Sequence, residues 1–483
     1  MKKQRKEAKE SYQLIVDGVE EKFLNRFYPM FMQNFMLPLY DLAKGTSRFM
    51  CSQVLEKTQW LSRKEIDHLQ TRNLHALLKY AYETVPYYRK VFKERHLLPG
   101  DIKNADDLIK LPVLTKTDIR KNFEDLISRA IPRDQLVPYE SGGTGNPINF
   151  YITKEKISWE IAAEFRMYGW AGYRLGDRCF LIWGAPADLS KHKGMITRLT
   201  KVLERTTIVD AFVMSDEVLC QFVYSLRKLK PKIVKGYATP IYMVAKCLLE
   251  NKISDVRPRA VITSAETLLY SRRKIIEDAF GCPVFDYYGS REVGAVAAEC
   301  EQHSGYHISA ENVVLEFVKK GEHVSSGESG VILVTNLRNF GMPFIRYEIG
   351  DVGKPSNEVC SCGRGLPLMS SIEGRLSEFM AVYDKRLGRI VPVSPAGPGV
   401  IGVALMHVPL ESYRIIQESL DRVVIKAVKG KGYSQKHTDF LISYVRRFLG
   451  DSVAIEVEFV NYLPPLPSGK RSAFISKVNA FGD

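Results

Sequence analysis

Apolar residues recur at helical spacing in the first part of the chain. They include Leu74, Leu77, Leu78 and Ala81, which a helix of 3.6 residues per turn places on one face. Pro86 is expected to end this helix, because proline disfavours the helical conformation of the residue before it. The pattern predicts a mostly helical beginning, with residues 1–74 as an N-terminal extension.

From residue 130 onward, short apolar runs alternate with amphipathic segments. The runs expected to form buried strands are 179–183, 233–234, 260–263, 284–287 and 331–334. The segment 266–280 has apolar positions at helical spacing, and Gly281 follows where the end of a helix favours glycine. Strand, helix and strand in succession predict the α/β class, with a large α/β sandwich domain over residues 75–374.

After residue 374 the pattern indicates a second, smaller unit. Residues 423–428 predict a strand, and 435–449 predict a helix with one apolar face. Residues 453–459 alternate apolar and polar side chains, which is typical of a half-buried strand. We therefore expect a small α+β domain over residues 375–483.

The composition is that of a soluble globular protein. The chain has 483 residues, of which 45% are hydrophobic and 26% are charged. No apolar stretch reaches the ~18 residues of a transmembrane helix, and no apolar signal region follows the N-terminal charges. Five scattered cysteines are expected to be reduced thiols: Cys51, Cys179, Cys220, Cys247 and Cys282. Together these features predict a cytoplasmic protein.

The formal net charge of +14 suggests a polyanionic partner. A nucleic acid, an anionic membrane or a substrate such as ATP would each fit. Acidic residues interrupt the basic run between Lys2 and Lys9, which favours a solvated N-terminus over a nucleic-acid-binding arm. Nucleic acid is therefore not expected as a partner.

The segment 27–43 is rich in phenylalanine and methionine. It could pack on the main domain, or it could contact a membrane or a protein partner. Pro29 and Pro38 are expected to interrupt a long amphipathic helix. This expectation favours the packed segment.

A glycine-rich loop spans residues 141–147, with the sequence SGGTGNP. Its glycines allow backbone N–H groups to approach an anion closely, and its hydroxyls are further donors. Alone it fits a surface turn equally well. It is not a Walker-type phosphate loop, because the Lys-Ser/Thr ending is missing.

Four later segments change the interpretation of this loop. They are YYGSRE at 287–292, RYEIGD at 346–351, GRLSE at 374–378 and SGK at 468–470. In this order and spacing they resemble the adenylate-forming superfamily of acyl-CoA synthetases, luciferases and peptide-synthetase adenylation domains. TSAETL (263–268), GYHIS (305–309) and CSCGR (360–364) point to the phenylacetate-CoA ligase branch. Within that branch the chain looks most like CapK-type proteins, which are associated with surface polysaccharide biosynthesis.

The resemblance implies a two-step ligase with a mobile C-terminal lid. A carboxylic acid and ATP would give acyl-AMP and pyrophosphate, and the acyl group would then pass to CoA. An amine of a sugar or an amino acid is the alternative acceptor. A non-catalytic scaffold that kept the fold is a further alternative.

The resemblance also assigns roles to single residues. The phosphate loop would comprise Ser141, Gly142, Gly143, Thr144 and Gly145. The other nucleotide-site residues would be Tyr288 and Gly289 at adenine, Asp351 at ribose, Arg375 beside the domain boundary, and Glu292 as the Mg²⁺ ligand. Lys470 would reach the α-phosphate and carboxylate during adenylation, and Glu378 would be the hinge.

Two positions depart from the family pattern. Gly143 stands where a serine or threonine is usual, which removes one hydroxyl from the loop. Arg291 replaces a small hydroxyl residue beside the AMP phosphate, and its guanidinium can make stronger phosphate bonds. Activity is still expected, because adenylation needs cations and N–H dipoles aimed at phosphate oxygens and no side-chain nucleophile.

A second constellation has the composition of a zinc site. Cys300 and His303 form C-x₂-H, and Cys360 and Cys362 form a distant C-x-C. Four such ligands suit tetrahedral, structural Zn²⁺, although unligated thiols are the alternative. His307 is the rival histidine; the spacing favours His303, and His307 is expected nearer the substrate pocket.

The sequence leaves the acid unnamed. Trp183, Tyr237 and the turn at 264–266 are candidates for the lining of the acyl pocket. A small carboxylic acid is the expected substrate.

Overall fold

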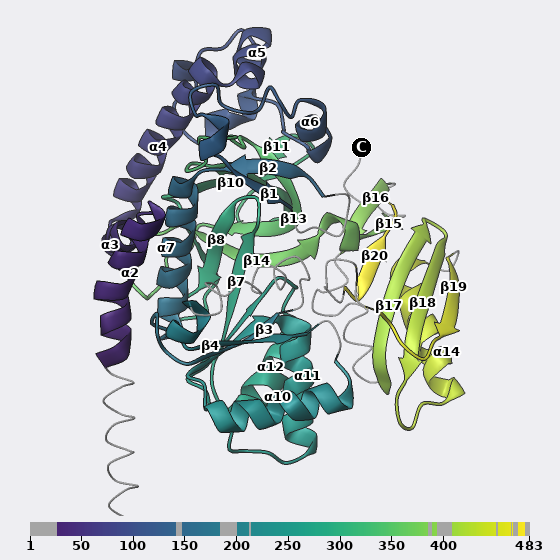
Figure 1. Cartoon of the computed structure of the whole chain (residues 1–483). Helices are drawn as coiled ribbons and strands as arrows, with labels where there is room; N and C mark the ends of the chain where they lie inside the picture. The colour runs from purple at the N-terminus through teal and green to yellow at the C-terminus, as the bar shows by residue number, and fades with distance from the viewer. Residues whose placement is uncertain are drawn as a thin grey trace, which may run out of the picture.

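The computed structural model is shown in Figure 1. It describes residues 27–141, 147–183, 200–211, 214–384, 389–393, 408–450, 453–464, 466 and 472–478. Lys470 and the loop residues Gly142, Gly143, Thr144 and Gly145 lie outside these ranges.

The chain begins with helices along one side of the body (Figure 1). Residues 27–44 are helical throughout, with a π turn (η1, Met32–Met36) before α2 (Leu37–Lys44). The expectation that proline interrupts this helix is wrong. The Leu37 N–H bonds the Met32 carbonyl in the wider π turn, and Pro38, which has no N–H, follows without breaking the helix.

Two further helices follow α3 (Arg48–Thr58), namely α4 (Arg63–Thr84) and α5 (Pro86–Glu94). A reciprocal Ser62–Glu65 capping box starts α4, and Pro86 is the first residue of α5, where its missing N–H costs nothing. The four apolar residues expected on one face of α4 are fully buried. The boundary expected at residue 74 falls inside α4.

Short elements then lead to the glycine-rich loop. They are η2 (Pro99–Asp101), η3 (Asp106–Lys110), α6 (Lys116–Lys121) and η4 (Arg133–Gln135). Strands β1 (Val137–Glu140) and β2 (Asn149–Ile152) pair antiparallel, so the loop connects the two strands of a hairpin.

Twelve of the described strands form one mixed sheet in the order β11-β10-β12-β13-β14-β9-β8-β7-β6-β5-β3-β4. Its parallel part comprises β3 (Cys179–Trp183), β4 (Thr206–Asp210), β5 (Ile233–Tyr237), β6 (Ala260–Ser264) and β7 (Val284–Ser290). The antiparallel part comprises β8 (Gly294–Glu299), β9 (Tyr306–Ile308), β10 (Val313–Lys319), β11 (Glu322–His323), β12 (Gly330–Asn336), β13 (Tyr347–Ser356) and β14 (Leu368–Arg375). All five strands expected from the sequence are present.

Helices cover the parallel part of the sheet. They are α10 (Asp216–Leu229), α11 (Ala238–Glu250) and α12 (Tyr270–Phe280), which bury one apolar core against β3, β5 and β6. The helix α7 (Lys154–Trp170) packs against α3 and β8. Gly281 ends α12 at φ 62°, as its position predicts. The α/β class is confirmed.

A smaller unit follows β14 (Figure 1, right). After η5 (Leu376–Glu378) come β15 (Met380–Asp384) and β16 (Arg389–Val393), which pair with each other. Strands β17 (Leu410–Ser419), β18 (Arg422–Lys429), β19 (Ala454–Phe459) and β20 (Phe474–Ser476) form a sheet in the order β19-β18-β17-β20. The helix α14 (Gln435–Leu449) has the bounds that the sequence predicts, and Leu441 and Val445 are fully buried.

Candidate active site and metal centre

The carboxyl ends of the parallel strands gather the residues expected to line the acyl pocket. Trp183 ends β3 and Tyr237 ends β5, and these strands are neighbours. The two rings meet edge to face, with centroids 4.6 Å apart. Ser264 ends β6, beside β5. A crevice at these strand ends is where open α/β sheets bind ligands.

The turn after β6 is held in a strained conformation. Ala265 has a φ of 69°, which residues with a side chain seldom adopt. The neighbouring Glu266 carboxylate accepts the backbone N–H of Thr239 at 2.8 Å, and Arg272 donates to the Thr239 hydroxyl at 2.8 Å. These bonds tie the turn to the start of α11. Such strain is typical of positions where the backbone is placed for a ligand.

The β7–β8 hairpin carries the YGSRE motif. Gly289 is required by packing, because a Cβ there would lie 2.7 Å from the Gly294 carbonyl oxygen. Glu292 lies in the tight turn between the strands and is only 6% exposed. Its carboxylate accepts the hydroxyl of Tyr347, from β13, at 3.3 Å. A buried carboxylate with one long hydrogen bond keeps oxygen lone pairs for a hard cation.

Asp351 is the centre of a small buried network. Its carboxylate accepts the Tyr288 hydroxyl at 2.8 Å and pairs with the Arg375 guanidinium at 3.0 Å. Burial and the adjacent Asp351 raise the pKa of Tyr288, so its phenol remains a donor. The structure thus brings together three residues that the sequence assigned to the nucleotide site. Arg291 lies in the turn that also holds Glu292.

Lys116 belongs to this group and was not expected from the sequence. Leu114 bonds through its backbone to Arg346 and Glu348, which pins the segment before α6 against β13. Lys116 interacts electrostatically with Glu292, Arg375 and Asp351. Burial lowers its pKa, and Glu292 opposes that shift. An ordinary lysine at the start of a short helix gives no sequence signal, and its place near the site depends on the pairing of Leu114 with β13.

Ser141 closes the base of the glycine-rich loop. Its N–H donates to the Ile148 carbonyl at 2.9 Å, and its Oγ accepts the Ile148 N–H at 2.9 Å. The side chain is 4% exposed. Ser141 therefore anchors both ends of the loop, and its hydroxyl proton remains available to a phosphate oxygen.

Glu378 lies where the body meets the small unit. One of its carboxylate oxygens accepts the Arg375 N–H at 3.1 Å, and the other accepts the Ser472 hydroxyl at 2.6 Å. Arg375 ends β14, and Ser472 is two residues beyond Lys470 in the sequence. The expected hinge residue therefore connects the last strand of the large sheet to the chain that carries the expected catalytic lysine.

The arginine of RYEIGD has a structural position. Arg346 is 4% exposed at a φ of 53°, and its guanidinium pairs with the buried Glu316 at 2.9 Å. It also donates to the carbonyls of Ile109 and Leu111. The ion pair fixes the start of β13, which in turn places Tyr347 and Asp351.

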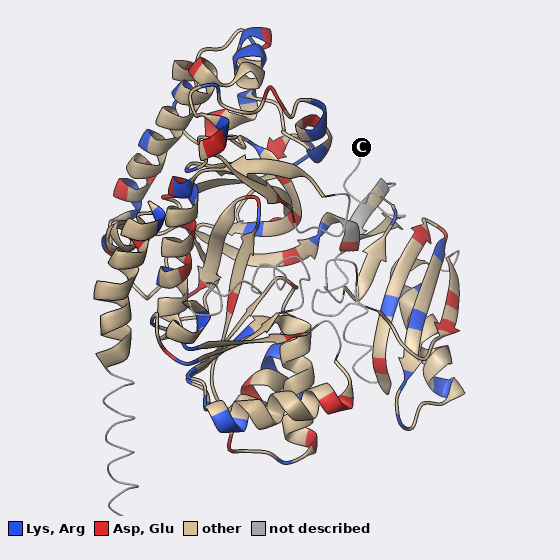
Figure 2. Cartoon of the chain, viewed as in Figure 1, with Lys and Arg blue, Asp and Glu red and all other residues tan. Residues whose placement is uncertain are grey.

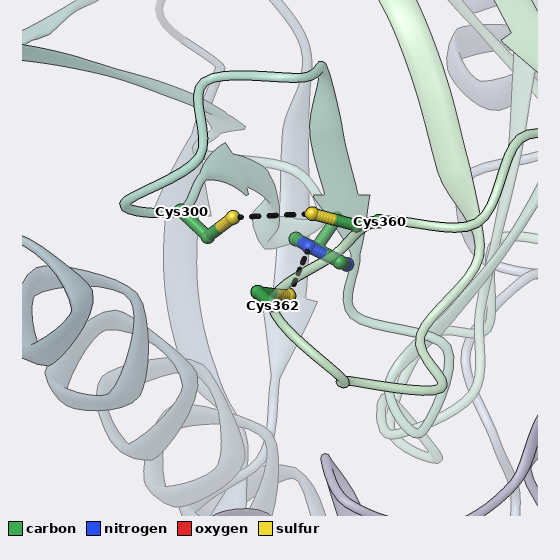
Figure 3. Close-up of side chains that lie close together, drawn as sticks. Cys300, Cys360 and Cys362 are labelled. Atoms are coloured by element: carbon green, nitrogen blue, oxygen red, sulfur yellow. Dashed lines mark hydrogen bonds between the residues drawn. The ribbon is translucent and has the colours of Figure 1, made fainter.

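Three thiols and one imidazole lie close together next to β8 and β9 (Figure 3). Cys300 follows β8, His307 lies in β9, and Cys360 and Cys362 lie between β13 and β14. The Cys300 and Cys360 sulfurs are 3.6 Å apart, and the Cys362 sulfur is 3.3 Å from His307 Nε2. All four ligand atoms lie within 4.8 Å of one another.

The expectation of His303 in this cluster is wrong. His303 adopts a φ of 50° in the turn after Cys300, and its Nδ1 contacts the Glu299 carboxylate at 3.3 Å. Its ring packs on Phe285, away from the sulfurs. The antiparallel pairing of His307 with Ala298 places His307 there instead. The alternation of side chains between the two faces of the GYHIS strand is the sequence signal that could have placed His307 in the cluster.

The donor set fits a zinc ion. In a tetrahedron, Zn–S bonds of ~2.3 Å and Zn–N bonds of ~2.0 Å place two sulfurs roughly 3.8 Å apart and a sulfur and a nitrogen roughly 3.5 Å apart. The S–S contact of 3.6 Å and the S–N contact of 3.3 Å are close to these separations. Burial lowers the pKa of His307 to about 4, so the imidazole is neutral, as a ligand must be. Burial and the neighbouring thiols raise the pKa of Cys300 to about 12. A bound divalent cation would stabilise the thiolates and so offset the free-energy cost of deprotonating the buried thiols.

Comparison with known proteins gives related chains over nearly the whole length. Residues 403–477 match the CapK C-terminal domain. Protein CapK of Staphylococcus aureus is 25% identical over 463 residues, which is 94% of this chain and 100% of the relative. A phenylacetate-coenzyme A ligase of Thermus thermophilus is 28% identical and covers 76% of this chain and 82% of its own. The chain is homologous to CapK and to the phenylacetate-CoA ligases. This confirms the resemblance drawn from the motifs.

Solved structures show the same fold. A 2-hydroxyisobutyryl-CoA ligase in its postadenylation state superposes with a TM-score of 0.69 at 21% identity, covering 88% of this chain and 92% of its own. The same enzyme in its thioesterification state gives 0.58. The large sheet and the small C-terminal unit of this chain therefore have the architecture of adenylate-forming ligases.

Proposed function

We propose that this protein is an adenylate-forming ligase that converts a small carboxylic acid and ATP into acyl-AMP and pyrophosphate and then transfers the acyl group to CoA. The observation that supports this most is a group of four charged residues, Glu292, Asp351, Arg375 and Lys116, which interact electrostatically and in which Asp351 pairs with Arg375 at 3.0 Å. The group combines two cations with two carboxylates: Asp351 would accept the hydroxyls of ribose, and Glu292 would bind Mg²⁺.

Each described group has a role in the first step. Asp351, held by Tyr288 and Arg375, would accept the ribose hydroxyls, and Glu292 would hold Mg²⁺, which supplies charge neutralisation at the phosphates. Lys116 would add a cation where two anions meet. Trp183 and Tyr237 would line the acyl pocket and exclude water from the carboxylate.

The small domain would supply the remaining cation. Lys470 is proposed to reach the α-phosphate during adenylation and to leave when the domain turns about Glu378. Ser141 to Gly145 are proposed to grip the β- and γ-phosphates, and Arg291 the AMP phosphate. The Glu378–Ser472 hydrogen bond supports this division, because it joins the proposed hinge to the segment next to the lysine.

We also propose that Cys300, His307, Cys360 and Cys362 bind one structural Zn²⁺. Four protein ligands leave no open coordination position, so the metal would hold β8, β9 and the β13–β14 connection together without entering the reaction.

Pyrophosphate exchange into ATP with a panel of carboxylic acids tests the adenylation step. Exchange with at least one acid supports the proposal, and its absence with every acid contradicts it. The acid found is then incubated with ATP and either CoA or amines, and the products are separated by mass. A thioester supports transfer to CoA, whereas an amide assigns the second step to an amine of the kind that a polysaccharide precursor would carry.

A further inference from the structure

The first helical segment exposes large apolar side chains along one side. The N-terminal apolar face, as we name it, consists of Phe27, Met30, Phe31, Phe35, Leu39 and Leu42. Between 45% and 82% of each side chain is exposed, with Leu42 the most exposed. Spacings of three and four residues place these positions on one side of the helix. Figure 2 shows this helix almost without charge along its length.

The opposite side of the same helix is already packed. Met32 and Leu37 are buried with Leu175 of the body, and the Tyr28 hydroxyl donates to the Leu203 carbonyl at 2.7 Å. Both sides of the helix are therefore apolar, and among the described residues only one side is covered. A helix that is hydrophobic all round is normally buried on every side.

A rigid corner extends the face onto the next helix. The buried Asp41 carboxylate accepts hydrogen bonds from Thr46, Arg48 and the backbone of Phe49. This corner fixes α3 beside α2, and α3 adds Met50 and Val54, which are 70% and 43% exposed. The hydrogen bonds of Asp41 thus hold the two helices that carry the exposed apolar residues next to each other.

Charge decides between the surfaces that could cover this face. Among the described residues 27–55, Asp41 is the single acid and is buried, whereas Lys44 is exposed at the edge of the face. Residues 1–10 contribute five basic and two acidic side chains, and the whole chain carries a formal charge of +14. A second copy of the chain would bring an equal charge of the same sign. An anionic lipid surface would instead attract this charge.

We propose that the N-terminal apolar face inserts into the interfacial layer of an anionic membrane and holds the protein at its surface. Within the described residues, none of the helices has both the length and the apolar character that a membrane span requires. The attachment is therefore peripheral, by side chains that reach the acyl boundary beside basic residues at the head groups. The small domain lies on the opposite side of the body (Figure 1), so docking through the N-terminal apolar face leaves this domain away from the membrane.

Co-sedimentation with vesicles tests this proposal. The full chain is mixed with vesicles of phosphatidylcholine alone or of phosphatidylcholine with 30 mol% phosphatidylglycerol, a composition of roughly the charge that anionic leaflets present. We expect binding to the anionic vesicles that weakens with added salt. The double variant Leu39→Ser/Leu42→Ser should bind about tenfold more weakly, because two inserted side chains lose apolar contact. Tyr224→Ser, at a 66% exposed apolar position on α10, is the matched control and should bind like the wild type.

Sedimentation velocity and circular dichroism of the same samples complete the test. Both variants should keep the wild-type helix content and thermal transition. A wild-type chain that pellets with neither vesicle, or a Leu39→Ser/Leu42→Ser chain that binds as well as the wild type, overturns the proposal. A wild-type dimer that the double variant dissociates also overturns it, because a second copy would then cover the face.

Discussion

Replacing His307 by alanine removes one ligand of the proposed zinc site while three thiols remain. The S–S contact of 3.6 Å and the S–N contact of 3.3 Å are close to the edges of a zinc tetrahedron, so we expect one Zn²⁺ per wild-type chain. We expect His307→Ala to lose most of this metal. His303→Ala should keep it, because His303 contacts Glu299 and Phe285 instead.

The expected loss in the free energy of unfolding follows from mass action. A native-state ligand present at 100 to 1,000 times its Kd stabilises a protein by about 2.7 to 4.1 kcal/mol. Removal of the metal by a chelator, or the His307→Ala substitution, should therefore lower the free energy of unfolding by roughly that amount. His303→Ala removes one long, partly exposed hydrogen bond and should cost about 1 kcal/mol or less.

Atomic absorption of the purified chains and urea denaturation with and without chelator make this measurement. The wild type and His303→Ala should lose stability when the chelator is added, and His307→Ala should not respond. A wild-type chain purified with zinc in the growth medium but without bound metal refutes the zinc proposal. Equal metal loss in both histidine variants refutes the assignment of His307.

Three further predictions concern the nucleotide site and its surroundings. Lys116→Ala should lower the rate of pyrophosphate exchange by about tenfold to a hundredfold while the melting temperature stays within a few degrees, and an unchanged rate would remove Lys116 from the site. Ser472→Ala should alter the ratio of adenylation to acyl transfer, measured as separate half-reactions, because it removes the hydrogen bond between the Ser472 hydroxyl and Glu378. Equal ratios in the variant and the wild type would contradict a role for this bond in domain movement. Burial and Glu299 raise the pKa of Asp286 to about 7, so the folded state holds a proton that the unfolded state releases above pH ~4. The contribution of Asp286 to stability is present at low pH and is lost as the pH rises toward 7. Asp286→Asn should therefore reduce the pH dependence of the free energy of unfolding, measured in urea, by at most a few kcal/mol. A pH profile equal to that of the wild type would contradict the raised pKa.

The regular elements could be predicted because their causes are local. The helix at 435–449 follows from apolar spacing, and the end of α12 follows from a glycine that accepts positive φ. The helix through Pro38 could not be predicted, since a π turn that absorbs a proline leaves no mark in the apolar pattern.

The site was predicted where a motif carries it and missed where distant pairing creates it. Tyr288, Asp351 and Arg375 come together as expected, because each lies in a motif at a strand end. The sequence did not place Lys116 in the nucleotide site or His307 in the metal cluster, for one reason. The position of Lys116 depends on the pairing of Leu114 with β13, and that of His307 on the pairing of β9 with β8. The register of strands distant in sequence is not visible in a local pattern.

The origin of the oxygen in AMP tests the adenylation mechanism most directly. The acid identified by exchange is supplied with both carboxylate oxygens replaced by ¹⁸O, and the products with ATP and the acceptor are analysed by mass. Attack of the carboxylate on the α-phosphate, followed by acyl transfer, leaves one ¹⁸O in AMP and none in pyrophosphate. Label in inorganic phosphate, with ADP as the second product, would show activation through an acyl phosphate and would contradict the proposed function.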